Sequence, residues 1–169
     1  MSNSEGKHSV FVYGSFQEPD VVEVLFERSH DSVSALLSGF HRYRIKGRLH
    51  PCITPLDTGK VSGKVLLGLT DDELKNLDMI EGSLYERKTV EVVLTGSSEK
   101  LQVETYVWAD KEDPNLYGEW DFEEWKQLHK EKFMEANKKF MEWKKNPQGN
   151  RIEAFEHLVK EDGGDAPTS

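Results

Sequence analysis

The hydrophobic pattern of the chain changes once, near Asp121, from short strand-like runs to a helical repeat. Before that point, runs rich in β-branched and aromatic residues alternate with turn-forming residues, which is typical of strands joined by tight connections. We expect strands over residues 10–13, 40–45, 61–69, 87–94 and 101–108. Pro51, Pro55, Asp57 and Gly59 predict a loop between the second and third of these. The pattern favours the α+β class, with a mixed sheet that curls into a small barrel.

Two short helices are predicted between the strands. Pro19 opens the first, in which residues 21, 22, 25 and 26 share an apolar face. Thr70 and Glu73 have the spacing of a capping box, so the second is expected over 71–80. Gly82 is then placed to end this helix in a left-handed conformation.

Beyond Asp121 the spacing predicts one long helix over residues 121–145, packed on the barrel through an apolar face. This face contains Trp125, Leu128, Phe133 and Phe140. After a break at 146–149, a last helix is expected over 150–160, followed by a polar, disordered tail. The predicted organisation is a domain at 9–118, a helical extension at 119–160 and a tail at 161–169.

Charge and composition exclude several classes of function. The formal net charge of −9 disfavours a general nucleic-acid-binding protein, because attraction to phosphate needs a basic surface. The chain has no apolar run near the ~20 residues of a membrane span, so no membrane association is expected. Cys52 is the only cysteine and no secretory signal is visible, which predicts a cytoplasmic protein. The pair His50 and Cys52 falls short of a zinc ligand set, so no metal site is predicted.

The first candidate site is the turn Tyr13-Gly14-Ser15-Phe16, directly after the first strand. Backbone N–H groups of such turns can form nests that bind carboxylates or oxyanions. Gly14 permits a positive φ angle, which this turn is expected to use. On this pattern alone, a simple turn is the more frequent explanation.

The second candidate is Glu81, at the C-terminal end of the predicted helix 71–80. The negative end of the helix dipole disfavours a carboxylate there, and the neighbouring Ile80 and Gly82 permit partial burial. Both effects raise the pKa of a glutamate and make it a usable acid or base near neutrality. Without further context, a solvated surface glutamate is the simpler alternative.

The two motifs together resemble the γ-glutamylcyclotransferase-like family. The resemblance lies in Tyr-Gly-Ser after a first strand, and in an acid-Gly pair followed by Tyr-x-Arg and a strand. It spans residues 10–108 and includes a central strand at 61–65. With its helical extension, the whole chain is most similar to the plant branch named for avirulence-induced genes.

The resemblance implies a mixed barrel with a cavity, and it implies roles for particular residues. A loop that maps onto Tyr13, Gly14, Ser15, Phe16, Gln17 and Glu18 would hold the γ-glutamyl group through backbone amides. Glu81 would be the proton acceptor, with Tyr85 and Tyr106 as further pocket residues. Phe16 stands where Asn or Leu is common, so the family's substrate preference does not carry over.

The implied reaction is intramolecular aminoacyl transfer. The α-amine of a γ-glutamyl amine or peptide attacks its own γ-carbonyl and releases 5-oxoproline and a free amine. The implied partner is therefore a small γ-glutamyl substrate; no metal or organic cofactor is needed, and a protein partner is unknown. Two alternatives stay open: a non-catalytic module that binds a small metabolite or a partner protein, and a related acyl-transfer enzyme with another amine substrate.

Overall fold

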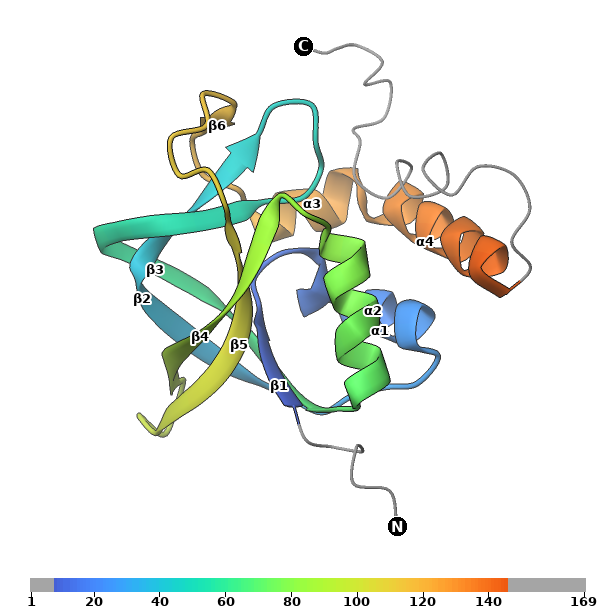
Figure 1. Cartoon of the computed structure of the whole chain (residues 1–169), viewed down its shortest axis with the longest axis horizontal. Coiled ribbons are helices and arrows are strands. Elements are labelled where there is room, and N and C mark those ends of the chain that lie inside the picture. Colours follow the sequence, from blue (N-terminus) through green and yellow to red (C-terminus); the bar gives the residue numbers. More distant parts are fainter. Residues whose placement is uncertain (1–7, 146–169) are drawn as a thin grey trace.

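The computed structural model describes residues 8–145, which form a closed mixed barrel with helices on one side (Figure 1). The strands are β1 (His8–Val12), β2 (Ser32–Ile45), β3 (Cys52–Leu69), β4 (Tyr85–Leu94), β5 (Lys100–Trp108) and β6 (Leu116–Tyr117). Strands pair in the order β3-β1-β5-β4-β2, and β2 pairs with β3 to close the barrel, while β6 joins the end of β2. Only β1 and β5 run parallel among these pairs of the described chain. The predicted α+β class and mixed barrel are confirmed.

The predicted loop between the second and third strands is wrong over most of its length. Strand β3 begins at Cys52 and includes Pro55, which pairs with Phe40 of β2. The next pair is Ser38 with Lys60, so residues 56–59 bulge opposite a single residue of β2. Proline is tolerated at such a bulge because it does not have to donate to the ladder. The turn-forming residues therefore mark an irregularity within a long hairpin.

Two short helices follow the sequence pattern closely. They are α1 (Pro19–Phe26) and α2 (Asp71–Glu81), and α2 has the predicted capping box between Thr70 and Glu73. Gly82 follows α2 with φ +83° and ψ −174°, so the expected left-handed helical conformation is wrong, although its φ is positive. Glycine adopts this conformation readily because it has no Cβ.

The predicted long helix is two helices, α3 (Phe122–Leu128) and α4 (Lys130–Lys145), which are separated at His129. The break leaves Trp125 and Phe133 buried in edge-to-face contact, with ring centroids 5.4 Å apart. Leu128 is 61% exposed, so its predicted packing on the barrel is wrong. The predicted contact of Phe140 lies outside the side chains described, as do the helix 150–160 and the tail 161–169.

The α4 helix packs against α1, as the orange and blue helices in Figure 1 show. The Lys130 ammonium at the start of α4 contacts the carboxylates of Glu18 (2.6 Å) and Asp20 (3.1 Å). The helical extension is therefore attached to the segment that follows β1.

The alternation of β1 divides the core into two layers. Phe11 and Tyr13 point into the barrel, whereas Val10 and Val12 pack beneath the helices. Tyr13 thus leaves the strand on the inner side, close to one mouth of the barrel.

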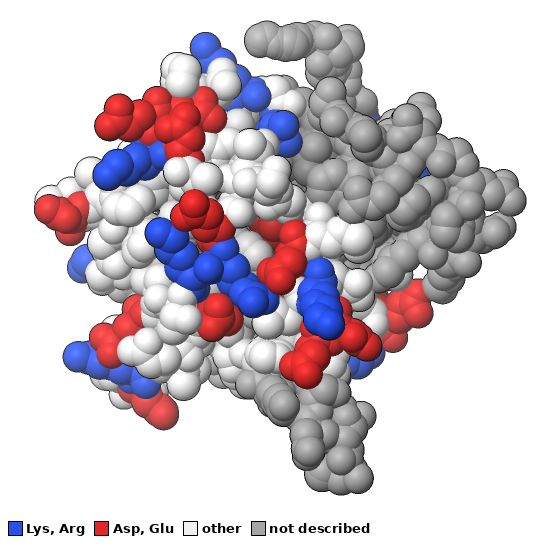
Figure 2. All heavy atoms as spheres, viewed as in Figure 1, with Lys and Arg blue, Asp and Glu red and all other residues white. Residues whose placement is uncertain are grey.

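None of the described helices is long and apolar enough to cross a membrane. Acidic and basic side chains interleave on the face shown in Figure 2.

Candidate active site

One cavity of about 230 Å³ lies at the barrel mouth, between the strands and the covering helices. It is lined by residues from the end of β1, the end of α2, the connection between β2 and β3, and α4. The cavity brings together Tyr13, Gly14, Ser15, Phe16, Glu81, Tyr85 and Tyr106, which are seven of the residues predicted from the sequence. The two motifs, 65 residues apart at their nearest ends (81 − 16), therefore share one space.

Hydrogen bonds fix both the backbone and the side chain of Tyr13, the first residue of the loop after β1. The Arg42 guanidinium donates to the carbonyl oxygens of Tyr13 (2.8 Å) and Ser62 (3.0 Å), and the Tyr13 hydroxyl donates to the carbonyl oxygen of Tyr106 (2.6 Å). A short 3₁₀ turn, η1 (Ser15–Gln17), follows. The first N–H groups of such a turn have no acceptor within it. The loop can therefore offer backbone donors to a ligand.

The expected positive φ angle at Gly14 is wrong, and this glycine is needed for close packing instead. Its φ is −119°, which other residues also adopt. A Cβ atom at this position would lie only 2.8 Å from the Cδ atom of Pro51, which lines the same cavity. The absence of a side chain lets the loop approach the β2–β3 connection.

Gln17 and Glu18 do not line the cavity. The Gln17 N–H donates to the Gly14 carbonyl oxygen (3.0 Å), and its side-chain amide approaches the same oxygen (3.3 Å). The Glu18 carboxylate faces Lys130 of α4. These two residues shape the turn and fasten it to the helical layer, and their predicted contact with substrate has no support in the geometry.

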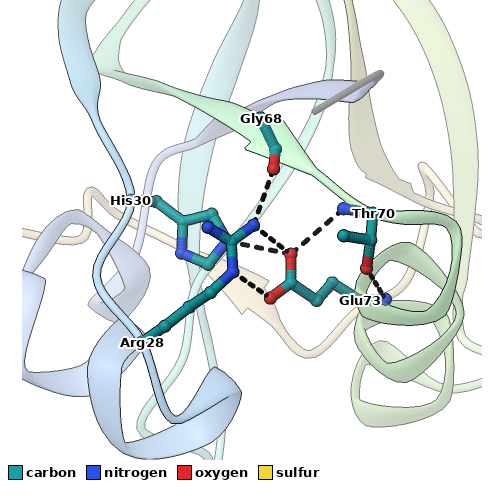
Figure 3. A network of polar contacts seen from close by, with 5 residues as sticks. All are labelled: Arg28, His30, Gly68, Thr70 and Glu73. Carbon is teal, nitrogen blue, oxygen red and sulfur yellow. Dashed lines mark hydrogen bonds and ion pairs between the residues drawn. The ribbon is translucent and has the colours of Figure 1, made fainter. Parts of the chain in front are cut away.

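The α2 helix, which ends with Glu81, is fixed at its other end by a network around Glu73 (Figure 3). Arg28 donates to both oxygens of this carboxylate (2.7 and 2.8 Å), and His30 and the Thr70 backbone N–H lie 3.0 Å from one of them. Burial alone would raise the pKa of Glu73, but these hydrogen bonds lower it to about 2. The network joins the segment before β2 to the first turn of α2.

The surroundings of Glu81 raise its pKa, whereas those of Glu73 lower it. It is half-buried at the cavity, and burial followed by the negative charge of Asp78 raises its pKa to about 8. Its charge is among the causes that raise the pKa of Tyr13, Tyr85 and Tyr106, after burial in each case. Glu81 therefore sits among three tyrosines and exchanges its proton near neutral pH.

Tyr85 and Tyr106 are fixed by hydrogen bonds at the cavity wall. The Tyr85 hydroxyl donates to the Pro51 carbonyl oxygen (2.7 Å), and the His50 Nδ1 atom lies 2.6 Å from the same hydroxyl. Because Tyr85 has one proton to donate, the second contact requires His50 to donate from Nδ1. Burial lowers the pKa of His50 to about 3, so this imidazole is neutral. The Tyr106 hydroxyl donates to Asp78 (2.5 Å).

Sequence reasoning missed several lining residues, including Leu25, Arg48, His50 and Phe133. In the sequence, His50 stands out only as a possible metal ligand beside Cys52. Leu25 and Phe133 belong to apolar helix faces, and nothing in the sequence places such faces at a cavity. Within residues 8–145, no three His, Cys, Asp or Glu side chains gather as a metal site requires.

A carboxyl group that titrates near neutrality, beside a loop with free backbone donors, suits proton transfer on a small anionic or amide substrate. The cavity holds about 230 Å³, which fits a ligand of a few tens of atoms at most. The arrangement therefore favours a small molecule over a polymer.

Comparison with known proteins gives consistent results. The model of the family described as "Gamma-glutamyl cyclotransferase, AIG2-like" matches residues 10–127. The chain is 63% identical to Protein AIG2 A of Arabidopsis thaliana over 98% of this chain and 97% of that protein. A solved solution structure of another Arabidopsis thaliana protein is 57% identical, with a TM-score of 0.64, covering 88% of this chain and 98% of the other.

A solved structure named gamma-glutamyl cyclotransferase is similar in fold alone, at 15% identity and a TM-score of 0.50, covering 96% of this chain and 93% of the other. The family match and the high-identity plant relatives both carry the AIG2 name. The chain belongs to the gamma-glutamyl cyclotransferase, AIG2-like family.

Proposed function

We propose that the protein is a γ-glutamylcyclotransferase, in which Glu81 transfers protons and the loop of Tyr13 to Phe16 binds the substrate. The observation that carries this proposal is the position of Glu81, with its pKa raised to about 8, in the same cavity as that loop. Family membership supports the reaction class. A pure binding module has no need of a proton-exchanging carboxyl group beside an anion-binding loop.

The reaction conserves every atom of the substrate. The α-ammonium loses a proton to the Glu81 carboxylate, and the free amine attacks the γ-carbonyl carbon. A new N–C bond closes the five-membered lactam as the original amide C–N bond breaks. The two protons lost by the α-ammonium end on the leaving nitrogen, with Glu81 returning at least one of them. The products are 5-oxoproline and an ammonium.

Glu81 is suited to both halves of this transfer. In the free protein it is mostly protonated at pH 7, since its pKa is about 8. A substrate ammonium beside it favours the carboxylate, which can then accept a proton. Because the pKa lies near the operating pH, the same group can give the proton back to the leaving amine.

The loop supplies orientation and charge stabilisation. The Arg42 side chain holds the Tyr13 carbonyl oxygen, and the C=O and following N–H of a trans peptide point in opposite directions. The Gly14 N–H is therefore turned away from Arg42. We assign this donor and those of Ser15 and Phe16 to the substrate carboxylate or the developing oxyanion. Fixing the reacting geometry can lower the barrier by ~7–11 kcal/mol in favourable models.

Incubation with a panel of γ-glutamyl amines and peptides tests the proposal, with 5-oxoproline and the released amine measured together by mass spectrometry. Equal molar amounts of the two products, formed in proportion to enzyme, are expected. Binding of the compounds without any 5-oxoproline would favour the non-catalytic module. Transfer of the γ-glutamyl group to an added amine, in place of cyclisation, would favour the related acyl-transfer reaction.

A further inference from the structure

The connection between β2 and β3 places a cationic side chain, Arg48, at the cavity. The proposed mechanism does not use this side chain. Arg48, His50 and Pro51 of this connection line the cavity. His50 is neutral because burial holds its pKa near 3, with the charge of Arg48 as a further cause. Arg48 is therefore the group that brings positive charge to this wall.

Arg48 differs from the other arginines of residues 8–145 in the polar contacts of its guanidinium group. Arg28 and Arg44 pair with glutamates, Arg42 donates to two carbonyl oxygens, and Arg87 pairs with Asp78 and Glu104. Within the same part of the chain, the Arg48 guanidinium has no hydrogen bond or ion pair.

This lack of a partner is unexpected for a half-buried arginine in an acidic protein. The chain has 31 acidic side chains against 22 basic ones, so carboxylate partners are abundant. A half-buried cation usually gains a paired anion, because desolvation is otherwise uncompensated. The guanidinium also has a planar set of donors that matches a carboxylate. Its open donors at the cavity fit an anionic ligand.

Two hydrogen bonds fasten the connection that bears Arg48. The hydrogen bonds from His50 to the Tyr85 hydroxyl and from Tyr85 to the Pro51 carbonyl oxygen hold the connection against β4. A Cβ atom on Gly14 would lie only 2.8 Å from the Pro51 Cδ atom, so the connection lies close to the substrate loop. The backbone next to Arg48 is therefore held at the cavity, two residues from His50.

We propose that Arg48 is a specificity-determining residue that binds a carboxylate of the substrate in this cavity. This inference rests on the proposed function for the nature of the substrate. The carboxylate can come from the γ-glutamyl group itself or from an amino-acid leaving group, and both present the same chemistry to a guanidinium. Arg48 acts in binding and takes no part in proton transfer.

Three matched substrates separate the two sources. γ-Glutamyl-alanine has both carboxylates, γ-glutamyl-isopropylamine has only that of the glutamyl group, and 4-aminobutanoyl-alanine has only that of the leaving group. Each retains an amine that can close a five-membered lactam. The variants are Arg48→Gln, Arg48→Lys as the conservative change, and Lys46→Gln as a matched loss of charge at an exposed position of the same connection.

Arg48→Gln is expected to raise KM for γ-glutamyl-alanine about 10-fold or more, with kcat changed less than about 2-fold, because a charged hydrogen-bonded contact is lost. Arg48→Lys should restore part of this loss, and Lys46→Gln should change nothing. If Arg48 binds the glutamyl carboxylate, γ-glutamyl-isopropylamine is affected equally and 4-aminobutanoyl-alanine is unaffected. The reverse pattern would mean that Arg48 binds the carboxylate of the leaving group. Unchanged KM for all three substrates would overturn the proposal.

Binding of glutaryl-alanine tests the role of Arg48 without requiring catalysis. It is γ-glutamyl-alanine without the α-amine, so it retains both carboxylates and cannot cyclise. Calorimetric titration should give a Kd about 10-fold or more weaker for Arg48→Gln than for wild type. Equal Kd values would reject the role of Arg48 even if turnover is found. A difference in Kd without any turnover would retain Arg48 as a carboxylate-binding residue and reject the cyclotransferase.

Discussion

Asp78 lies one helical turn before Glu81 on α2, and after burial its negative charge is the further cause that raises the pKa of Glu81 to about 8. Residues three apart on a helix are neighbours, so the two carboxyl groups act on each other directly. Asp78 itself receives a hydrogen bond from Tyr106 (2.5 Å) and pairs with Arg87 (3.1 Å). These contacts fix the Asp78 side chain one turn from Glu81, the residue whose pKa is raised.

The pH dependence of turnover should follow Glu81. If its carboxylate is the base, kcat/KM rises about 10-fold per pH unit below pH 8 and levels off above it. Asp78→Asn should move the rise to lower pH, because a charge that raises the pKa of Glu81 is removed. The substrate amine also titrates in this range, so the shift between variants is the decisive quantity.

Asp72→Asn is the matched control, since it removes the same charge from an exposed position nearer the start of α2. Its profile should coincide with that of wild type. Coincident profiles of Asp78→Asn and wild type would mean that Asp78 does not set the protonation of the base.

Replacing Glu81 should not destabilise the fold. Its folded pKa of about 8 lies above its ordinary value of 4.5, so the folded state binds more protons between these pH values. Stability is therefore lost as pH rises from about 4.5 to 8. Glu81→Gln removes this loss, and its Tm should exceed that of wild type at pH 9 but not at pH 4. The exposed change Glu135→Gln should show no such divergence. A lower Tm for Glu81→Gln at pH 9 would contradict the assigned shift.

Glu73→Gln should lower stability in the opposite pH window. The folded pKa of Glu73, about 2, lies below its ordinary 4.5, so its contribution is present above pH 4.5 and is lost as pH falls toward 2. Glutamine can retain the capping box while losing the charge that Arg28 and His30 contact. The unfolding free energy at pH 7 should fall by at least about 2 kcal/mol. Chemical denaturation measures this, with the exposed Glu91→Gln as control.

The break at His129 predicts different effects for two apolar residues of the extension. Phe133 is 6% exposed and also lines the cavity, whereas Leu128 is 61% exposed. Phe133→Ala should cost ~3–5 kcal/mol of unfolding free energy and weaken substrate binding. Leu128→Ala should stay within about 0.5 kcal/mol of wild type. Equal losses from both would support the single continuous helix that the sequence predicted.

The sequence was informative wherever the signal was local. The capping residues Thr70 and Glu73 located α2, and the alternation in 87–94 and 101–108 located the β4–β5 hairpin. The two site motifs were found because each is a short run next to a strand or helix end. Their meeting in one cavity depends on barrel closure through β2–β3 pairing, which follows from long-range contacts and was anticipated from the family resemblance.

Other features depended on packing that no local pattern contains. Pro55 looked like a loop residue because nothing in its surroundings signals that a bulge opposite β2 accommodates it. The apolar period of 121–145 does not show that Lys130 will contact Glu18 and Asp20 at the point where α3 gives way to α4. Arg48 has no motif at all, and its lack of a partner is visible only in three dimensions.

Turnover by Glu81→Gln compared with wild type tests the central claim most directly. The measurement is the initial rate of 5-oxoproline release from the best γ-glutamyl substrate at pH 8, with the fold of the variant checked by its Tm. We predict a loss on the order of 10²-fold or more, because glutamine is nearly isosteric but cannot accept the proton. A folded Glu81→Gln protein that releases 5-oxoproline at the wild-type rate, with an unchanged pH profile, would contradict the account.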